Sequence, residues 1–264
     1  MLTQGLNRTW KSSRMTRATD QCVRNAFDAE ADQYFDSRQT SNSFRAQRDI
    51  LLRWLAPHPG PILELGCGSG DMLVSLMAAD KPVTGVDLSG EMLMRAARRL
   101  RDAAHVDLLQ ADTRCLPFPE QAYNVVVTMG VIEYVPDPMQ MLREIARVLR
   151  PGGVLALTLP HSQCAARNWG VAMKSFSKTI RGREGEADQV TIRRYQADEF
   201  DRFLEPCGLR RIDSAFCGVR MLPWPLTDYW PGLTAKCNAI CERFKVLSRR
   251  RRLAGVYCVF CERL

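Results

Sequence analysis

A glycine-rich segment, residues 64–70 (ELGCGSG), is the feature that most limits how this chain of 264 residues can fold. A short apolar run precedes it and a helical pattern begins at Asp71, so the segment stands where a strand ends and a helix begins. Glycines at such a junction allow a sharp turn and let a ligand approach main-chain amides, while the helix N-terminus favours an anionic group. The segment therefore predicts an α/β sheet with a ligand at the end of its first strand.

The alternation of strands and helices continues along the chain. Short apolar runs rich in β-branched residues alternate with helical patterns, which requires parallel strands joined by crossover helices. The expected strands are 61–66, 82–87, 106–111, 123–129, 154–159, 209–216 and 255–261. The expected helices are 20–55, 71–79, 91–102, 138–150 and 196–207. The fold class predicted from this pattern is α/β.

Length and composition predict one domain with elaborations, since the chain is 46% hydrophobic and 25% charged. The predicted parts are a disordered basic arm at 1–19, a helical cap at 20–60, and a main domain at 61–264 with insertions at about 160–195 and 217–253. The arm carries no acid before Asp20, so an organelle transit peptide is the alternative. No apolar run approaches the roughly 18 residues of a membrane span, which predicts a soluble cytoplasmic protein.

Ten cysteines raise the question of disulfides or zinc. They are spread through apolar segments, which is typical of reduced, buried thiols. The pairs Cys237-x3-Cys241 and Cys258-x2-Cys261 have a spacing that a zinc site can use. However, alternation along a strand points Cys258 and Cys261 to opposite faces of a sheet. We therefore expect no metal site.

Acidic residues near the glycines decide which cofactor fits. A dinucleotide site needs a third glycine at position 71, where Asp71 would instead place a negative side chain against a pyrophosphate. A cofactor that carries an ammonium and a sulfonium tolerates both Glu64 and Asp71. At the end of the second strand, Asp87 can accept hydrogen bonds from ribose hydroxyls. At the end of the third, Asp112 offers a carboxylate to an adenine amino group.

With these residues in place, the stretch 62–159 resembles the class I S-adenosylmethionine (SAM) methyltransferases. The resemblance is strongest to the small-molecule branch, which includes ubiquinone-biosynthesis and malonyl-carrier-protein methyltransferases. It rests on an ordered series of motifs: ELGCGSG, then LPFP at 116–119, NVVV at 124–127, IEYV at 132–135 and LRPGG at 149–153. The resemblance implies SAM as the cofactor and a Rossmann-like, doubly wound, mostly parallel seven-stranded sheet whose last strand is antiparallel.

The resemblance also implies a cofactor site, with separate groups of residues for the methionine end, the ribose and adenine, one adenine face, the adenine edge and the sulfonium. The methionine end would be held by Glu64, Gly66, Gly68 and Gly70, and the ribose and adenine by Asp87 and Leu88. One adenine face would contact Met92, and the adenine edge would contact Asp112 and Thr113. Met129 and Gly130 would lie beside the sulfonium. Each feature has a structural alternative: a glycine turn without ligand, a helix cap at Asp87, or plain core at Met92 and Met129. Their order and spacing together favour the cofactor interpretation.

The sequence departs from the family pattern at two positions. Asn124 stands where relatives usually have Asp, which affects local hydrogen bonding. Tyr134 stands where many relatives have His, and an ordinary tyrosine titrates near pH 10, which argues against a base there. Among three histidines, His161 follows the fifth strand, where loops line the ligand crevice, so it is the catalytic candidate. A solvated loop histidine is the alternative.

The net charge of +8 comes from three segments outside the predicted sheet. They are the arm, the insertion that ends at Tyr195, and the run from Lys236 to Arg252; the remaining residues are net acidic. In the topology that the resemblance implies, these segments surround the mouth of the site, which suggests an anionic acceptor, an acyl carrier or an anionic membrane surface. The aromatic segment 222–231 suggests a pocket wall, an interfacial anchor or a packed subdomain.

The acceptor classes can be ranked. A small-molecule or lipid-like acceptor comes first, a carrier-bound acid second, and RNA or protein third, since no RNA-binding module accompanies the arginine run 249–252. A cofactor-binding partner subunit without transferase activity stays open as a different class. Nothing in the sequence indicates the oligomeric state.

Overall fold

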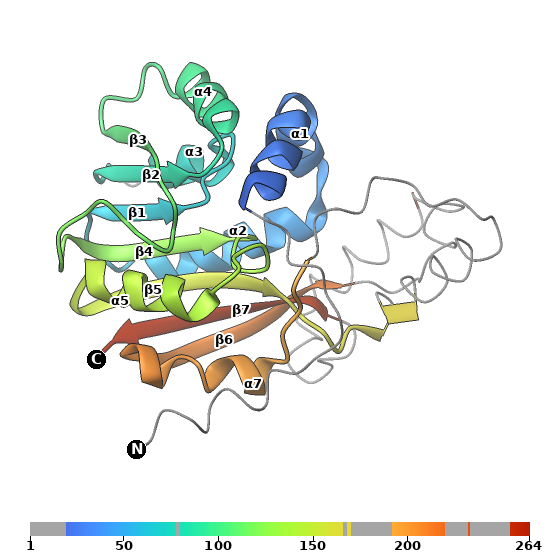
Figure 1. Ribbon diagram of the computed structural model, residues 1–264, viewed down its shortest axis with the longest axis vertical. Coiled ribbons are helices and arrows are strands. Elements are labelled where there is room, and N and C mark those ends of the chain that lie inside the picture. Colours follow the sequence, from blue (N-terminus) through green and yellow to red (C-terminus); the bar gives the residue numbers. More distant parts are fainter. Residues whose placement is uncertain (1–19, 78–79, 166–167, 170–191, 220–231, 233–253) are drawn as a thin grey trace.

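The computed structural model describes residues 20–77, 80–165, 168–169, 192–219, 232 and 254–264 (Figure 1). Its strands are β1 Ile62–Leu65, β2 Val83–Asp87, β3 Val106–Gln110, β4 Tyr123–Met129, β5 Leu149–Pro160, β6 Leu209–Val219 and β7 Ala254–Arg263. Its helices are α1 Asp20–Thr40, α2 Asn42–Leu55, α3 Asp71–Met77, α4 Gly90–Arg99, α5 Pro138–Val148 and α7 Ala197–Asp201, followed by a 3-10 turn, η1 Glu205–Cys207.

The strands form one seven-stranded sheet in the order β3-β2-β1-β4-β5-β7-β6. Strands β1 to β5 pair in parallel, whereas β7 is antiparallel to both β5 and β6. This confirms the predicted doubly wound, mostly parallel sheet with an antiparallel last strand. The strand order reverses between β1 and β4, and ligands of open α/β sheets bind outside the carboxyl ends of the strands at such a point.

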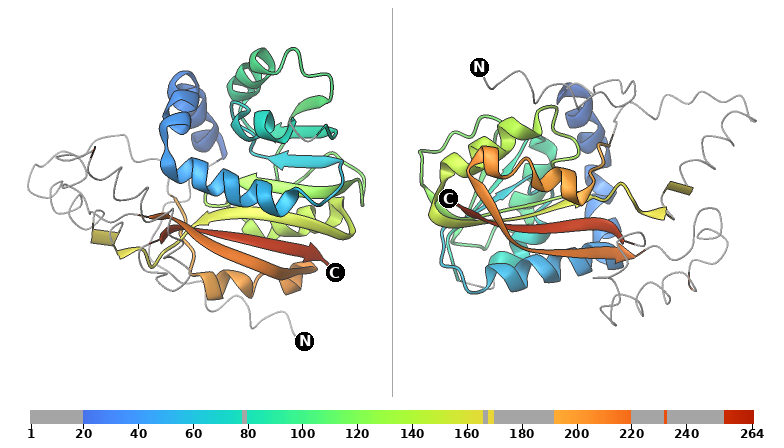
Figure 2. Two further views of the ribbon diagram at one scale, coloured as in Figure 1. Left: turned by 180° about the vertical axis from the view of Figure 1, so that it is seen from behind. Right: turned by 90° about the horizontal axis from the view of Figure 1, so that it is seen from below.

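Two apolar cores cover the two faces of the sheet (Figure 2). On one face, Val126 of β4 packs with α5 and α7 through buried residues such as Ile145 and Phe200. On the other face, Val125 and Val127 of the same strand pack with α2, α3 and α4. Both faces of β4 are therefore buried, which explains its nearly continuous apolar sequence.

Three predicted helices end earlier than expected, and the one expected over 91–102 is α4, which ends at Arg99. The helix expected over 138–150 stops at Val148, because Leu149 already pairs with Tyr123 as the first residue of β5. The helix expected over 196–207 is reduced to α7 and η1, where Pro206 lacks an N–H and Gly208 ends the turn at φ +77°.

The helix expected over 20–55 consists of two helices. Ser41 interrupts it with an extended backbone, and its hydroxyl accepts a hydrogen bond from Phe44 N at 3.3 Å, which starts α2. The first helix, α1, lies at the carboxyl ends of the parallel strands, while α2 packs on the sheet (Figures 1 and 2). The residues predicted as one cap thus have two different places in the fold.

Several predictions fall on residues outside the described ranges. They include the arm at 1–19, most of both insertions, the aromatic segment 222–231, the arginine run 249–252, and Cys237 and Cys241. The described cysteines agree with the predicted alternation, because Cys258 lies in the core of the α2 face and Cys261 in the core of the α5 face. Within the described ranges, no helix combines the length and the apolarity that crossing a membrane requires.

Candidate functional site

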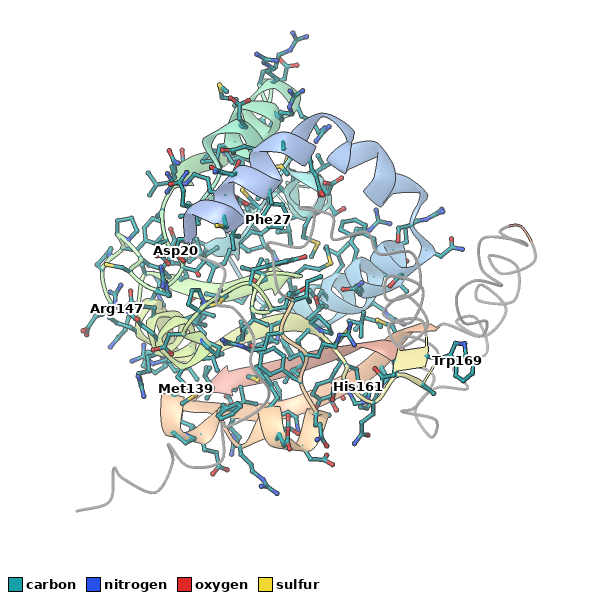
Figure 3. The ribbon with its side chains drawn as sticks, turned by 45° about the vertical axis from the view of Figure 1, so that its right-hand side comes forward. Asp20, Phe27, Met139, Arg147, His161 and Trp169 are labelled. Atoms are coloured by element: carbon teal, nitrogen blue, oxygen red, sulfur yellow. The ribbon has the colours of Figure 1, made fainter. Side chains whose placement is uncertain are left out.

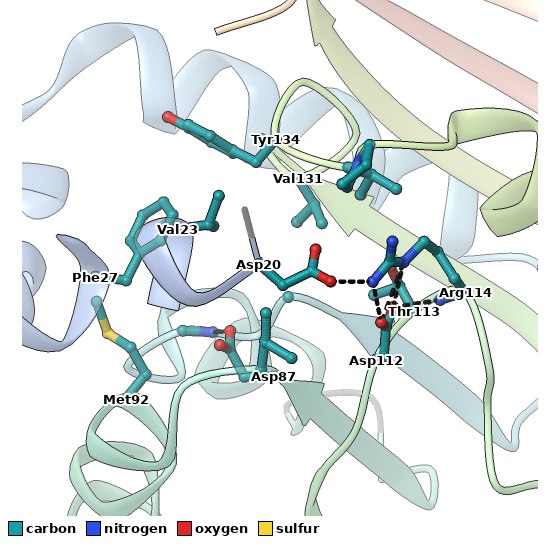
Figure 4. A pocket seen from close by; sticks show the side chains of 16 residues that line it. Asp20, Val23, Phe27, Asp87, Met92, Asp112, Thr113, Arg114, Val131 and Tyr134 are labelled. Atoms are coloured by element: carbon teal, nitrogen blue, oxygen red, sulfur yellow. Dashed lines mark hydrogen bonds and ion pairs between the residues drawn. The ribbon is translucent and has the colours of Figure 1, made fainter. Parts of the chain in front are cut away.

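A cavity lies at the carboxyl ends of β1, β2 and β4, with α1 against it (Figure 4). It brings together most of the predicted cofactor residues. Those that line it are Gly66, Gly68, Asp87, Leu88, Met92, Asp112, Thr113 and Gly130. The sequence did not predict its other lining residues as part of a cofactor site: Asp20, Val23, Phe27, Arg114, Val131, Tyr134, Val135 and Pro136.

The glycine segment takes a backbone path that other residues rarely adopt. Gly66, Gly68 and Gly70 have φ values of +68°, +52° and +87°. A Cβ atom on Gly66 would lie 2.2 Å from Cγ2 of Val131, so the segment also passes very close to the loop after β4. At Gly66 both the left-handed φ and the lack of space require glycine.

Asp87 organises the polar end of the cavity. Its carboxylate accepts hydrogen bonds from Gly68 N at 2.8 Å and from Ser89 N at 2.9 Å. Burial raises the pKa of Asp87, while the backbone N–H groups of Ser89, Gly68 and Leu88 lower it. The N-cap of α4 is Ser89, whose hydroxyl accepts from Met92 N at 3.0 Å, so capping does not account for Asp87. A carboxylate has about four lone-pair positions, which leaves Asp87 capacity for a ligand hydroxyl.

Asp112 and Arg114 form a second polar cluster at the cavity (Figure 4). Arg114 donates to both carboxylate oxygens of Asp112, and its Nη2 also lies 2.5 Å from Oδ2 of Asp20 in α1. The hydrogen bond from Arg114 lowers the pKa of Asp112, so this carboxylate is ionised at neutral pH. No spacing rule points to Arg114, because its role depends on Asp20, which lies far away in the sequence.

Three predicted residues do not line the cavity. Glu64 is 3% exposed within β1. Gly70 lies against α4, since a Cβ at this position would be 3.4 Å from the Cβ of Ala96. Met129 is 6% exposed and belongs to the apolar core on the α2 face. These three residues lie beside the cavity and pack the elements that form it.

The other end of the cavity is apolar. It is formed by Val23 and Phe27 of α1 and by four residues of the loop after β4, namely Val131, Tyr134, Val135 and Pro136. The rings of Phe27 and Tyr134 meet edge to face, with centroids 5.1 Å apart. The guanidinium of Arg193 donates to the carbonyl oxygens of Val135 and Pro136, which fixes this loop. Polar groups at strand ends therefore adjoin an apolar wall within one cavity.

His161 does not line this cavity. It follows β5, is 1% exposed, and its ring meets Phe216 edge to face with centroids 5.1 Å apart. Figure 3 shows it away from Asp20 and Phe27 of α1. The structure thus does not bring the predicted catalytic residue together with the predicted cofactor residues. Asn124, the first departure from the family pattern, lies near the amino end of β4, away from the cavity. Its side chain accepts a hydrogen bond from Arg150 and donates one to Gly60 O.

Comparisons with known proteins point to one family. A model described as a methyltransferase domain matches residues 63–157. The chain is 30% identical over 175 residues to a demethylmenaquinone methyltransferase of Listeria welshimeri, covering 63% of this chain and 73% of that protein. It is 36% identical over 120 residues to a trans-aconitate 2-methyltransferase of Azoarcus sp., covering 45% and 46%. The chain spans less than half the length of the first curated relatives it matches.

A solved structure shares the fold. Magnesium protoporphyrin IX methyltransferase from Synechocystis, solved with bound S-adenosylhomocysteine (SAH), superimposes with a TM-score of 0.62 at 12% identity, covering 93% of this chain and 100% of that one. The chain belongs to the class I SAM-dependent methyltransferases, and its cofactor is SAM.

Proposed function

We propose that this chain transfers a methyl group from SAM to an oxygen or nitrogen of a small, hydrophobic or lipid-like acceptor. The observation that carries this proposal is the cavity in which Asp87 and Asp112 adjoin an apolar wall from α1 and the loop after β4. The two curated relatives described above are named for small molecules, which supports the same acceptor class. The aromatic pair Phe27 and Tyr134 favours an apolar part of the acceptor near that wall.

The cavity fits the cofactor by the chemistry of its groups. Asp87 has acceptor capacity for a ribose hydroxyl, Asp112 has acceptor capacity for an adenine amino group, and Met92 supplies an apolar face. The left-handed backbone at Gly66 and Gly68 favours glycine, which has no side chain to fill the methionine end. We propose as contact residues the predicted ones that line the cavity: Gly66, Gly68, Asp87, Leu88, Met92, Asp112, Thr113 and Gly130. Glu64, Gly70 and Met129 would not touch the cofactor but would pack the elements that carry these contact residues.

The chain contributes alignment and exclusion of water. SAM supplies a methyl group that its sulfonium already activates toward a nucleophile, so the protein mainly has to orient the acceptor in line with it. Helix α1 and the loop after β4 cover the cavity with Val23, Phe27 and Val135, which limits the access of water. An acceptor hydroxyl needs a base, whereas an ionised carboxylate does not.

The base role of His161 remains a proposal with a direct test. If His161 removes the acceptor proton, His161→Asn abolishes methyl transfer while SAH binding, measured by calorimetry, stays unchanged. Because His161 is buried beside Phe216, circular dichroism of the variant serves as the control for folding. Unchanged transfer in the folded variant would remove His161 from the mechanism.

The alternative acceptors depend on segments outside the described residues. Methylation of a carrier-bound acid, of RNA or protein, or action at an anionic membrane surface draws support from the basic residues of the arm and the two insertions. Two described arginines near the cavity already have partners within this chain. Arg193 donates to the carbonyl oxygens of Val135 and Pro136, and Arg114 pairs with the carboxylates of Asp20 and Asp112. The non-catalytic partner subunit would bind SAM without producing SAH.

One assay separates these acceptor classes. The chain is incubated with SAM that carries a radiolabelled methyl group and with a host extract, which is then split into organic-soluble, aqueous small-molecule, protein and RNA fractions. We expect the label in the organic-soluble fraction. Label in the protein or RNA fraction contradicts the proposed acceptor class, and cofactor binding without label in any fraction favours the non-catalytic subunit.

A further inference from the structure

Arg114 holds Asp112 in a fixed orientation at the wall of the cavity. The backbone N–H of Arg114 donates to Oδ1 of Asp112 at 2.8 Å, and its Nε donates to the same atom at 3.0 Å. Its Nη2 lies 2.5 Å from Oδ2 of Asp112. Gln140 holds the main chain of Arg114 in turn, through a 3.0 Å hydrogen bond from its side-chain amide to Arg114 O. The carboxylate plane of Asp112 is therefore set by a neighbour two residues away.

Counting donors shows what Asp112 can still bind. A carboxylate offers about four lone-pair positions. Three hydrogens of Arg114 reach this carboxylate: the backbone N–H donates to Oδ1, Nη2 donates to Oδ2, and the single Nε hydrogen is shared between Oδ1 at 3.0 Å and Oδ2 at 3.1 Å. About one position on the carboxylate thus remains, on a side chain that lines the cavity and is 34% exposed. A single free acceptor position suits a single N–H donor of a ligand.

The same guanidinium reaches α1. Nη2 of Arg114 carries two hydrogens, and it lies 2.5 Å from a carboxylate oxygen of Asp112 and 2.5 Å from one of Asp20, the first residue of α1. Asp20 and Asp112 are like charges, so without the cation between them they would repel each other. Arg114 is therefore the link that keeps the start of α1 beside the wall of the cavity.

We propose that Arg114 is a cofactor-positioning residue that orients Asp112 toward the adenine amino group and ties α1 to the adenine end of the cavity. This inference rests on the proposed placement of adenine at Asp112. It assigns two separable effects to one side chain. Through Asp112, Arg114 acts on the recognition of the base; through Asp20, it acts on how long α1 keeps the cofactor in place.

The first experiment tests recognition of the base. SAH and S-inosylhomocysteine, in which a carbonyl oxygen replaces the adenine amino group, are titrated against the chain and against Arg114→Met. The wild-type chain should bind SAH at least about tenfold more tightly than the inosine analogue, since a hydrogen bond to a charged acceptor is lost. Arg114→Met should reduce this preference to about twofold or less. A purely structural role for Arg114 would weaken both ligands equally.

The second experiment tests the link to α1. Dissociation of SAH is followed by stopped-flow for the wild type, Asp20→Asn, Arg114→Met and the double variant. Asp20→Asn should speed dissociation several-fold without changing the preference for SAH over the inosine analogue. In the double variant the two effects should be strongly non-additive, because each single change breaks the same contact. Additive effects would overturn the link.

Controls keep the two proposals apart. Arg101→Met removes the arginine of an exposed ion pair with Asp102 and should leave both measurements unchanged. If Arg114→Met does not fold, Arg114→Lys serves instead, since it keeps the charge but loses the two-pronged contact and should keep only part of the preference. Failure of the wild type to bind SAH contradicts the proposed function. Binding of SAH with an unchanged preference in the Arg114 variants contradicts only this inference.

Discussion

Gly66 illustrates how much a single residue contributes to this site. It combines a left-handed φ of +68° with a position at which a Cβ would lie 2.2 Å from Val131. Gly152 has nearly the same φ, +72°, but nothing lies within 4 Å of the place where its Cβ would be. Substitutions at these two positions therefore distinguish the cost of a left-handed backbone from the cost of a steric clash.

Substituting these two glycines by alanine should have different results. Gly152→Ala carries only the backbone strain, about 1 kcal/mol of stability, and should leave SAH affinity unchanged. Gly66→Ala adds a clash that displaces Val131 or the glycine segment, so SAH affinity should fall at least about tenfold. Thermal unfolding and calorimetry measure the two quantities.

A rescue variant checks the cause of the effect at Gly66. Adding Val131→Ala to Gly66→Ala removes Cγ2, the atom in closest conflict, and should restore part of the SAH affinity. Equal losses of affinity for Gly66→Ala and Gly152→Ala, or no rescue by Val131→Ala, would show that the close approach at Gly66 is unimportant for binding.

At the residue scale, the sequence predicts the acids and glycines of the cavity better than their partners. Asp87 ends one predicted strand and Asp112 follows another, so their place at the carboxyl ends of the sheet follows from parallel topology alone. Arg114 and Asp20 meet only in the tertiary structure, and Phe27 reaches Tyr134 only because α1 lies at the ends of the strands. His161 follows β5 as predicted, but packing against Phe216 decides where its ring lies.

At the scale of elements, α5 fastens the segment after β3. Glu144 of α5 accepts hydrogen bonds from Leu116 N at 2.8 Å and from Arg147 Nε at 2.8 Å. Arg147 also donates to the carbonyl oxygens of Leu116 and Phe118. The predicted LPFP motif is thus held to a helix by backbone hydrogen bonds, which side-chain patterns in a sequence do not reveal.

This contact predicts a pH dependence of stability. The hydrogen bond from Arg147 holds the pKa of Glu144 below its ordinary value of 4.5. Because the folded pKa is the lower one, the stabilisation is present above pH 4.5 and is lost as the pH falls through the folded value. Glu144→Gln should lower the free energy of unfolding by about 1–2 kcal/mol at pH 7, and the difference from wild type should shrink toward pH 3.

Urea unfolding at pH 7, 5 and 3.5 measures this dependence. The matched control is Glu199→Gln, because Glu199 is an exposed glutamate of α7. It should change stability by less than about 0.5 kcal/mol at each pH. A difference between Glu144→Gln and wild type that stays constant from pH 7 to pH 3.5 would contradict the assigned role of the carboxylate.

Element boundaries show where sequence patterns stop being informative. Amphipathic spacing predicts that α5 exists, but it does not predict the end at Val148, which depends on the pairing of Leu149 with Tyr123. The break at Ser41 separates two helices that a continuous helical pattern joins. In both cases a contact between distant residues decides the boundary.

At the scale of the whole molecule, the cavity joins α1 to the ends of β1, β2 and β4. A ligand in it should therefore stabilise the folded chain as a unit. SAH at 100 times its dissociation constant should add about 2.7 kcal/mol to the free energy of unfolding. For a chain of this size, this corresponds to a rise of about 5–10 °C in the unfolding temperature.

Asp87→Asn provides the comparison for this measurement. At the same SAH concentration the variant should show a clearly smaller rise, since it loses a charged acceptor at the polar end of the cavity. Asp107→Asn, an exposed acid of β3, is the matched control and should respond like the wild type. An equal rise in all three proteins would remove Asp87 from the proposed site.

The topology of the sheet could be predicted because the ordered motifs resemble those of a family whose strand arrangement is known. The apolar end of the cavity could not, because its wall combines α1 with a loop more than 100 residues later in the chain. The helical pattern over 20–55 shows which residues are apolar, but it does not show against which edge of the sheet they pack.

The lining of the cavity divides the described chain into two parts. Every described residue that lines it lies between Asp20 and Pro136, whereas β5, β7 and β6 complete the sheet without reaching it. The residues that we propose as contacts of the nucleoside therefore all come from the first half of the sequence. Substitutions in β5, β7 or β6 that leave the sheet folded should therefore not remove a side chain from the lining of the cavity.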